Sequence, residues 1–141
     1  MDRVFTAWID KHRIIDGDPV EVLLDLGYRI FHRVVVRLEG IDCPEMRRTA
    51  SKAAGVVAAK AAGRWIEEHA RSMPLRVESY RLVPDMYGRT IGDILAGDES
   101  LARWLLGEGL AKTTLPGGKR PEWTAAELRR IIDDAPAAPG G

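Results

Sequence analysis

Hydrophobic and polar residues alternate along residues 20–26, where every even position is apolar and two of the three odd positions are acidic. A period of two predicts a strand with one buried face. The segment RIFHRVVVRLEG that follows is β-branched and aromatic, which predicts a second, longer strand. Gly27 lies between them and can adopt the positive φ of a tight hairpin. A further strand is expected within residues 4–15.

The pattern changes to helical spacing over residues 51–70, where alanine dominates and the apolar positions form one face (Ala54, Val57, Ala58, Ala61 and Trp65). Alternation returns in LRVESYRL and, after the turn VPDMYGR, in TIGDILA. Ser100 can cap a short helix, LARWLLGEG, that ends at Gly107 or Gly109. Thr124 and Glu127 have the spacing of a capping box at the start of a last helix.

The order is therefore three strands, a helix, two strands and two helices. This order is typical of an α+β fold built on a five-stranded OB-fold β-barrel with about three helices. We expect one domain over residues 1–134 and a disordered tail over residues 135–141, where the sequence is APAAPGG.

Composition narrows the function classes. The 141 residues carry a formal net charge of zero, so nucleic-acid binding would require a local basic patch. A single cysteine cannot form an internal disulfide. We find neither a signal peptide at the N-terminus nor an apolar run of the roughly 20 residues that would span a membrane. The expectation is a cytoplasmic monomer without membrane contact.

Carboxylates stand where the predicted strands begin and end. Asp18 precedes the strand at residue 20, and Asp42 follows the strand that ends near residue 38. In an antiparallel hairpin the start of one strand lies beside the end of the other, so Asp18 and Asp42 should be neighbours. Hard divalent cations prefer carboxylate and carbonyl oxygens. The pair therefore indicates either a metal site or ordinary turn aspartates that bond to their own backbone, as Asp16 also could.

Two arginines add a phosphate-binding element. Arg37 lies on the strand that leads to Asp42, and Arg89 follows the turn DMYG. Arginine stays charged and binds phosphate with two nitrogens. A cation, two guanidiniums and a free carboxylate such as Glu45 are the groups required for attack of water on a phosphodiester. Each arginine alone fits a solvated surface residue equally well.

The sequence resembles the staphylococcal nuclease (thermonuclease) family. The matching segments are IDGD at 15–18, VRLEGIDCPE at 36–45, DMYGR at 85–89 and LARWLLGEGLAK at 101–112. The first three have the order and separations of the family, and the resemblance covers roughly residues 13–115. The combination of these segments, with their glycine, proline and charged positions, is more specific to the family than any one of the segments alone.

The resemblance implies a role for each matching residue. Asp18, Asp42 and the backbone carbonyl of Cys43 correspond to ligands of a catalytic Ca²⁺. Glu45 corresponds to the glutamate that activates the attacking water. The phosphate-binding arginines correspond to Arg37 and Arg89, and a tyrosine near the bound nucleotide corresponds to Tyr87.

The implied activity is Ca²⁺-dependent hydrolysis of DNA, and of RNA as a further candidate, with little sequence preference and with 3′-phosphate products. The alternative is a non-catalytic OB-fold module that binds nucleic acid or a protein. Such modules typically lose site carboxylates or arginines, and this chain retains all of them. A third hypothesis is that the enzyme is active only with a divalent metal other than Ca²⁺, since an oxygen-rich site can bind several such ions.

The chain departs from the family pattern at three positions. Pro19 replaces a frequent threonine, which is tolerated at the first position of a strand. Leu115 stands near the position of a base-stacking tyrosine, and the loss of such a ring removes about 1–3 kcal/mol per base. At Cys43, which stands at the position of a threonine, the side chain is expected to be small and half-buried.

The three histidines and four tryptophans are interpreted as structural.

Overall fold

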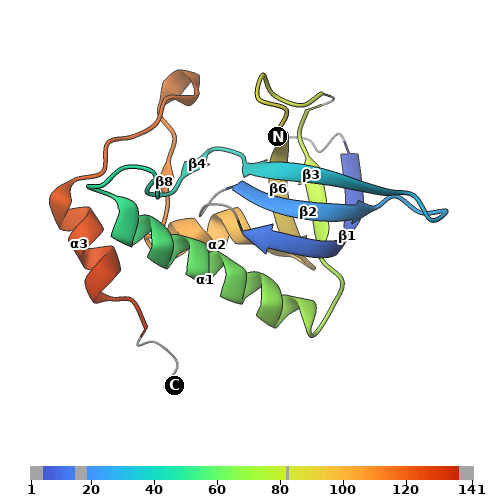
Figure 1. Cartoon of the computed structure of the whole chain (residues 1–141), viewed down its shortest axis with the longest axis horizontal. Coiled ribbons are helices and arrows are strands. Elements are labelled where there is room, and N and C mark those ends of the chain that lie inside the picture. The colour runs from blue at the N-terminus through green and yellow to red at the C-terminus, as the bar shows by residue number, and fades with distance from the viewer. Residues whose placement is uncertain (1–4, 15–18, 82, 137–141) are drawn as a thin grey trace.

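Five strands form a closed barrel (Figure 1). The computed structural model describes residues 5–14, 19–81 and 83–136. The barrel strands are β1 (Phe5–Ile14), β2 (Pro19–Asp25), β3 (Phe31–Leu38), β5 (Arg76–Ser79) and β6 (Thr90–Ala96). Antiparallel pairs join β2 to both β1 and β3, and β5 to both β1 and β6, while a parallel pair of β3 and β6 closes the ring. The expected OB-fold is confirmed.

Three helices and three short strands complete the described part of the chain. The helix α1 (Lys52–Ala70) connects β3 with β5, as expected for an OB-fold, and α2 (Leu101–Gly107) and α3 (Ala125–Asp133) follow the barrel. The short strand β4 (Ile41–Asp42) pairs with β8 (Lys112–Thr113), and β7 (Glu99–Ser100) extends β6. A 3₁₀ turn, η1, covers Pro116–Gly118. Figure 1 shows α1 crossing the barrel and α3 lying beside the N-terminal end of α1.

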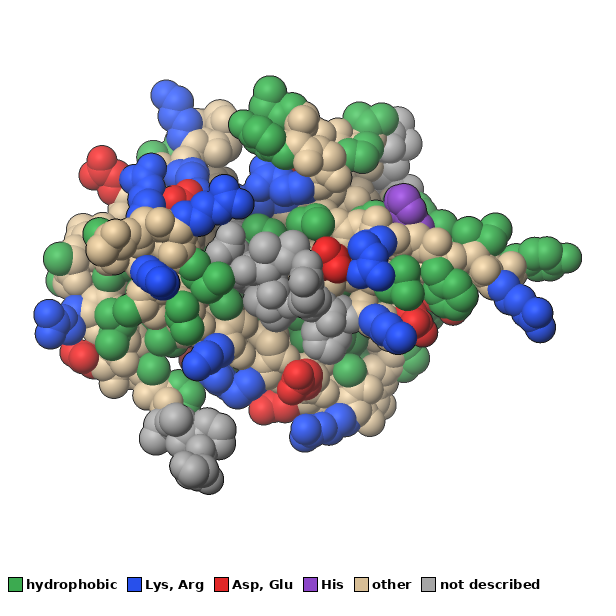
Figure 2. Space-filling model, in the orientation of Figure 1, with side chains coloured by type: hydrophobic (Ala, Val, Ile, Leu, Met, Phe, Trp, Pro, Cys, Tyr) green, Lys and Arg blue, Asp and Glu red, His purple; other side chains and the backbone are tan. Residues whose placement is uncertain are grey.

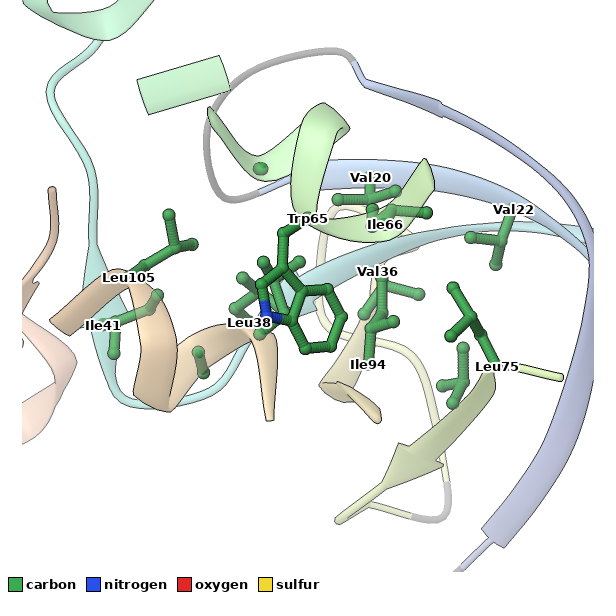
Figure 3. Close-up of a cluster of buried hydrophobic side chains, with 14 of the residues drawn as sticks. Val20, Val22, Val36, Leu38, Ile41, Trp65, Ile66, Leu75, Ile94 and Leu105 are labelled. Carbon is green, nitrogen blue, oxygen red and sulfur yellow. The ribbon is translucent and has the colours of Figure 1, made fainter. Parts of the chain in front are cut away.

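The core lies between the barrel and α1. Trp65 and Ile66 of α1 point toward inward-facing side chains of β2, β3 and β6 (Figure 3), and all of these residues are at most 4% exposed. A second, smaller cluster joins Ala54 at the start of α1 with Leu128 and Ile131 of α3. Burial of this apolar surface is the main stabilising contribution to folding. The second cluster fixes α3 near the start of α1.

Local capping signals in the sequence are confirmed. The Ser100 hydroxyl accepts a hydrogen bond from the Arg103 N–H at the start of α2, and Gly109 adopts φ 71° just after that helix. At α3 the Thr124 and Glu127 side chains each accept a hydrogen bond from the other's backbone N–H. Pro19 is the first residue of β2, where its missing N–H is tolerated. The caps at Ser100 and Thr124 fix where α2 and α3 begin, before and after β8 in the chain.

Two interpretations from the sequence are wrong. Trp8 is 53% exposed, and His32, which the alternation places on the core face, is also exposed. His32 is exposed because the β2–β3 hairpin extends past the end of the barrel (Figure 1), and the neighbouring hairpin residues Tyr28 and Ile30 are exposed as well. Alternation therefore predicts the face of a strand and not the length over which that face is covered.

The expected tail of residues 135–141 lies largely outside the described residues, and its disorder stays a prediction. In the described part of the chain, none of the helices has the length and apolar character needed to cross a membrane.

Candidate active site

The loop that carries Glu45 is held by the start of α1. The Ser51 hydroxyl, at the N-cap position, donates a 2.6 Å hydrogen bond to the backbone carbonyl of Glu45 instead of capping the helix. Gly55 lies so close to this loop that an added Cβ would stand 2.7 Å from the carbonyl oxygen of Pro44. The helix and the loop are therefore in close contact, which holds the backbone from which the Glu45 side chain extends.

Arg37 lies at the end of β3, opposite Pro19 of β2. One terminal nitrogen of its guanidinium donates hydrogen bonds to the carbonyls of Leu38 (2.9 Å) and Ile41 (2.8 Å). These bonds hold a partly buried guanidinium at the point where the chain leaves the barrel. A guanidinium is a planar fork of N–H donors, a geometry that suits phosphate oxygens.

Asp85 organises the turn that carries Tyr87 and Arg89. Its carboxylate accepts hydrogen bonds from the backbone N–H groups of both residues, at 2.9 and 2.8 Å, and from the Arg89 side chain at 2.8 Å. Burial raises the pKa of Asp85, but these hydrogen bonds outweigh burial, so the pKa lies below its usual value. The Arg89 guanidinium also lies 5.1 Å from the centre of the exposed Tyr87 ring.

One pocket of about 700 Å³ brings these elements together. Five of the seven site residues predicted from the sequence line this pocket: Arg37, Cys43, Glu45, Tyr87 and Arg89. Its lining also includes Arg47, Gly118 and Arg120. With four arginines and one glutamate, the lining carries an excess of positive charge that favours an anionic ligand.

Asp42 is buried next to this pocket, and each oxygen of its carboxylate accepts a hydrogen bond. It is 2% exposed, and one oxygen accepts a 2.6 Å hydrogen bond from Arg120 Nε. Its other oxygen accepts a 3.0 Å hydrogen bond from the indole N–H of Trp123. A terminal nitrogen of Arg120 pairs with Glu45, which also contacts Arg48 at 3.0 Å. A single guanidinium thus bridges Asp42 and Glu45.

Sequence reasoning did not assign Arg120 or Trp123 to this site. It interpreted Trp123 as structural, and Trp123 does pack against the small cluster around α3. The sequence signal for their position is weak, because Asp42 and Arg120 are separated by 78 residues. Two features of GGKRPEW point to a role: two consecutive basic residues and a tryptophan, directly before a capped helix.

The implied Ca²⁺ can be tested against the side chains present. Asp42 and Glu45 direct their carboxylates at one positive group, Arg120, so this position already favours a cation, and carboxylate oxygens suit Ca²⁺. Asp18, the other proposed carboxylate ligand, lies outside the described residues. Among the residues that are described, no three His, Cys, Asp or Glu side chains are grouped to hold a metal ion. The donor chemistry fits, and the complete ligand set stays a prediction.

Positive charge surrounds this part of the surface. Figure 2 shows Lys and Arg side chains gathered around an acidic one, over the region where Figure 1 places β4 and β8. Leu115, expected at a base-stacking position, is 48% exposed and is absent from the residues that line the pocket. Lys60 and Arg64 are exposed on α1 and also lie outside the lining. The positive charge of the pocket lining therefore comes from Arg37 of β3 and from three arginines outside the helices and strands, Arg47, Arg89 and Arg120.

Comparison with known proteins agrees with this geometry. Residues 35–138 match the family described as "Staphylococcal nuclease homologue". Over 100 residues the chain is 33% identical to the protein named "Thermonuclease" of Staphylococcus intermedius, an alignment that covers 71% of this chain and 55% of that protein. The chain thus spans about half the length of this curated relative. The match over most of its residues shows that the chain belongs to the staphylococcal nuclease homologue family.

Proposed function

We propose that this protein is a Ca²⁺-dependent phosphodiesterase that hydrolyses DNA, and RNA as well, with little sequence preference and with 3′-phosphate products. The observation that carries the proposal is the convergence of Arg37, Arg89 and Glu45 in one pocket, next to the buried carboxylate of Asp42. The name of the relative, Thermonuclease, supports a nuclease activity.

Each residue has a defined part in this chemistry. Arg37 and Arg89 bind the nonbridging oxygens of the scissile phosphate and stabilise the negative charge that develops in the transition state. Glu45 accepts a proton from the attacking water, and Tyr87 contacts the adjacent nucleotide from its exposed position. Arg37 donates to two backbone carbonyls and Arg89 Nε donates to the Asp85 carboxylate, and these bonds orient both guanidiniums before the substrate binds.

The cation would be held by Asp18, Asp42 and the carbonyl of Cys43. When bound, it would neutralise charge on the phosphate and polarise a phosphoryl oxygen. The burial of Asp42 strengthens its interaction with any positive partner, because few waters screen the charge.

The proposal is tested with purified protein and 5′-labelled single-stranded DNA, double-stranded DNA and RNA. We expect cleavage with millimolar Ca²⁺ and none with excess chelator, and parallel titrations of Mg²⁺ and Mn²⁺ identify the productive ion. Treatment of the products with a 3′-phosphatase should slow their migration, because it removes the terminal phosphate. Absence of cleavage of all three substrates with Ca²⁺ would contradict the proposal.

One observation favours the second candidate, a non-catalytic OB-fold module that binds nucleic acid. Arg120 pairs with both Asp42 and Glu45, so the two carboxylates are satisfied without a metal. If the module is correct, single-stranded DNA binds in a salt-sensitive way with no cleavage under any metal condition. Cleavage that depends on a divalent ion would exclude this candidate.

A further inference from the structure

The bridge between Arg120 and the two carboxylates occupies the position that the proposed function assigns to a metal. Arg120 Nε lies 2.6 Å from one oxygen of Asp42, and a terminal nitrogen of the same guanidinium pairs with Glu45. A buried carboxylate is stable only with a positive or hydrogen-bonding partner. In this structure that partner is a side chain of the chain itself.

The two partners of Asp42 differ in how firmly they are held. The indole of Trp123 packs against the cluster of α1 and α3, and the Lys112 ammonium lies 5.3 Å from its ring centre. The Arg120 side chain is 47% exposed and lines the pocket. Trp123 can therefore remain on its oxygen while Arg120 moves away from the other.

The turn before Arg120 is well defined. Leu115 and Lys119 pair through a 2.8 Å backbone hydrogen bond, and Gly117 and Gly118 adopt φ values of 79° and 76°. Beyond Arg120, the Lys112 ammonium donates to the Glu122 carbonyl and pairs with Glu127 of the α3 capping box. Both ends of the segment are anchored, so residue 120 is kept next to Asp42 and only its long side chain needs to move.

We propose that Arg120 is a built-in competitor of the divalent cation: it occupies Asp42 and Glu45 in the metal-free protein and must leave Asp42 for the metal to bind. This inference rests on the proposed function and adds a control of metal affinity to it. A guanidinium and a cation that need the same carboxylate oxygen exclude each other, so the observed metal affinity is lowered by the stability of the Arg120 bridge.

The pocket offers the displaced guanidinium a second partner. Arg120 lines the same cavity as Arg37 and Arg89, where the phosphate of a substrate would lie. A bound polynucleotide therefore draws Arg120 away from Asp42 and favours entry of the metal. By linkage, the metal must then strengthen the binding of the polynucleotide by the same factor.

The test is a calorimetric titration of Ca²⁺ into the metal-free full chain, which does not depend on catalysis. We expect the Arg120→Gln variant to bind Ca²⁺ about tenfold more tightly than the wild type, within the usual range of coupling between competing ligands. Lys119→Gln is the matched control, because it removes one positive charge from the same turn. Equal affinities of the Arg120→Gln and Lys119→Gln variants, or weaker binding by Arg120→Gln, would overturn the proposal.

A second variant keeps the test valid if Arg120→Gln folds poorly. Arg120→Lys retains the charge but cannot bridge two carboxylates with a rigid fork. We expect its affinity for Ca²⁺ to lie between those of the wild type and Arg120→Gln. A folded Arg120→Lys protein with the Ca²⁺ affinity of the wild type would contradict the proposal that the Arg120 bridge competes with the metal.

The cleavage assay on the same preparations separates the two proposals. If the wild type cleaves DNA with Ca²⁺ but Arg120→Gln does not bind Ca²⁺ more tightly, the proposal that Arg120 competes with the metal is rejected and the proposed phosphodiesterase activity is retained. If Arg120→Gln binds Ca²⁺ more tightly but no preparation cleaves DNA, the proposal that Arg120 competes with the metal is retained and the proposed phosphodiesterase activity is rejected. Absence of Ca²⁺ binding to every variant would reject both.

Discussion

Gly55 of α1 packs directly against the carbonyl oxygen of Pro44, and this contact determines where the neighbouring Glu45 lies. A Cβ at Gly55 would stand 2.7 Å from that oxygen and 2.9 Å from Met46 Cγ, both closer than ordinary van der Waals contact. The backbone of Gly55 is helical and does not itself require glycine. The reason for glycine is therefore space, and the space is occupied by the loop of the candidate site.

We expect Gly55→Ala to lower nuclease activity because it moves the Glu45 loop. In a helix interior, alanine is favoured over glycine by about 1 kcal/mol, which offsets part of the strain and leaves the protein folded. The measurement is kcat and KM for DNA together with the free energy of unfolding. Gly107→Ala is the control, because its added Cβ meets nothing within 4 Å at the end of α2. Unchanged kcat in Gly55→Ala would show that the contact does not position Glu45.

Trp123→Phe keeps an aromatic ring near α3 and removes the hydrogen bond to Asp42. A hydrogen bond to a charged group contributes about 1.5–3 kcal/mol, and its loss leaves one oxygen of a buried carboxylate without this donor. We expect the free energy of unfolding, measured with urea, to fall by about this amount. Trp8→Phe, at an exposed ring of β1, should change it by less than about 0.5 kcal/mol. Equal losses in the two variants would argue against a role for the indole N–H.

Asp42 and Arg120 should show strong coupling in a double-mutant cycle. Arg120→Gln leaves the Asp42 charge buried with one fewer partner, so the metal-free protein should lose roughly 1–3 kcal/mol, less than for a fully buried pair because the guanidinium is half-exposed. In an Asp42→Asn background the same change should have little effect, because no charge remains to be neutralised. Additive losses across the cycle would show that the pair is not coupled.

The turn at Asp85 should be sensitive to acid. Its pKa is lower in the folded protein than in the unfolded chain, so the ionised carboxylate stabilises the fold above the unfolded value of about 4. This stabilisation is lost as the pH falls through the folded pKa. We expect the difference in unfolding free energy between the wild type and Asp85→Asn to be constant near neutral pH and to shrink on acidification. A difference that grows on acidification would contradict this assignment.

Much of the fold could be predicted from local signals. Alternation located β2 and β3, and the Thr124–Glu127 spacing located the start of α3, because both depend on residues close in the sequence. Residue chemistry and the family resemblance together indicate Arg37, Glu45 and Arg89, the resemblance alone indicates Tyr87, and the structure places all four around one pocket. Asp18 stays a prediction, since it lies outside the described residues.

The contacts that join distant segments could not be predicted in this way. Arg120 reaches Asp42 only because α3 packs on the start of α1 and β8 pairs with β4, and neither contact leaves a periodic pattern in the sequence. The close approach of Gly55 to Pro44 is likewise hidden in an alanine-rich helix, where a glycine has no distinctive spacing. Such details depend on how whole elements pack.

The most direct test of the account is the rate of Ca²⁺-dependent DNA cleavage by Glu45→Gln, measured in single turnover with saturating enzyme. Glu67→Gln, which removes an exposed carboxylate from α1, is the matched control. We expect Glu45→Gln to be slower than the wild type by about 10²–10⁴-fold, the usual contribution of a general base, and the control to match the wild type. A cleavage rate for Glu45→Gln within a few-fold of the wild type would contradict the active site proposed here.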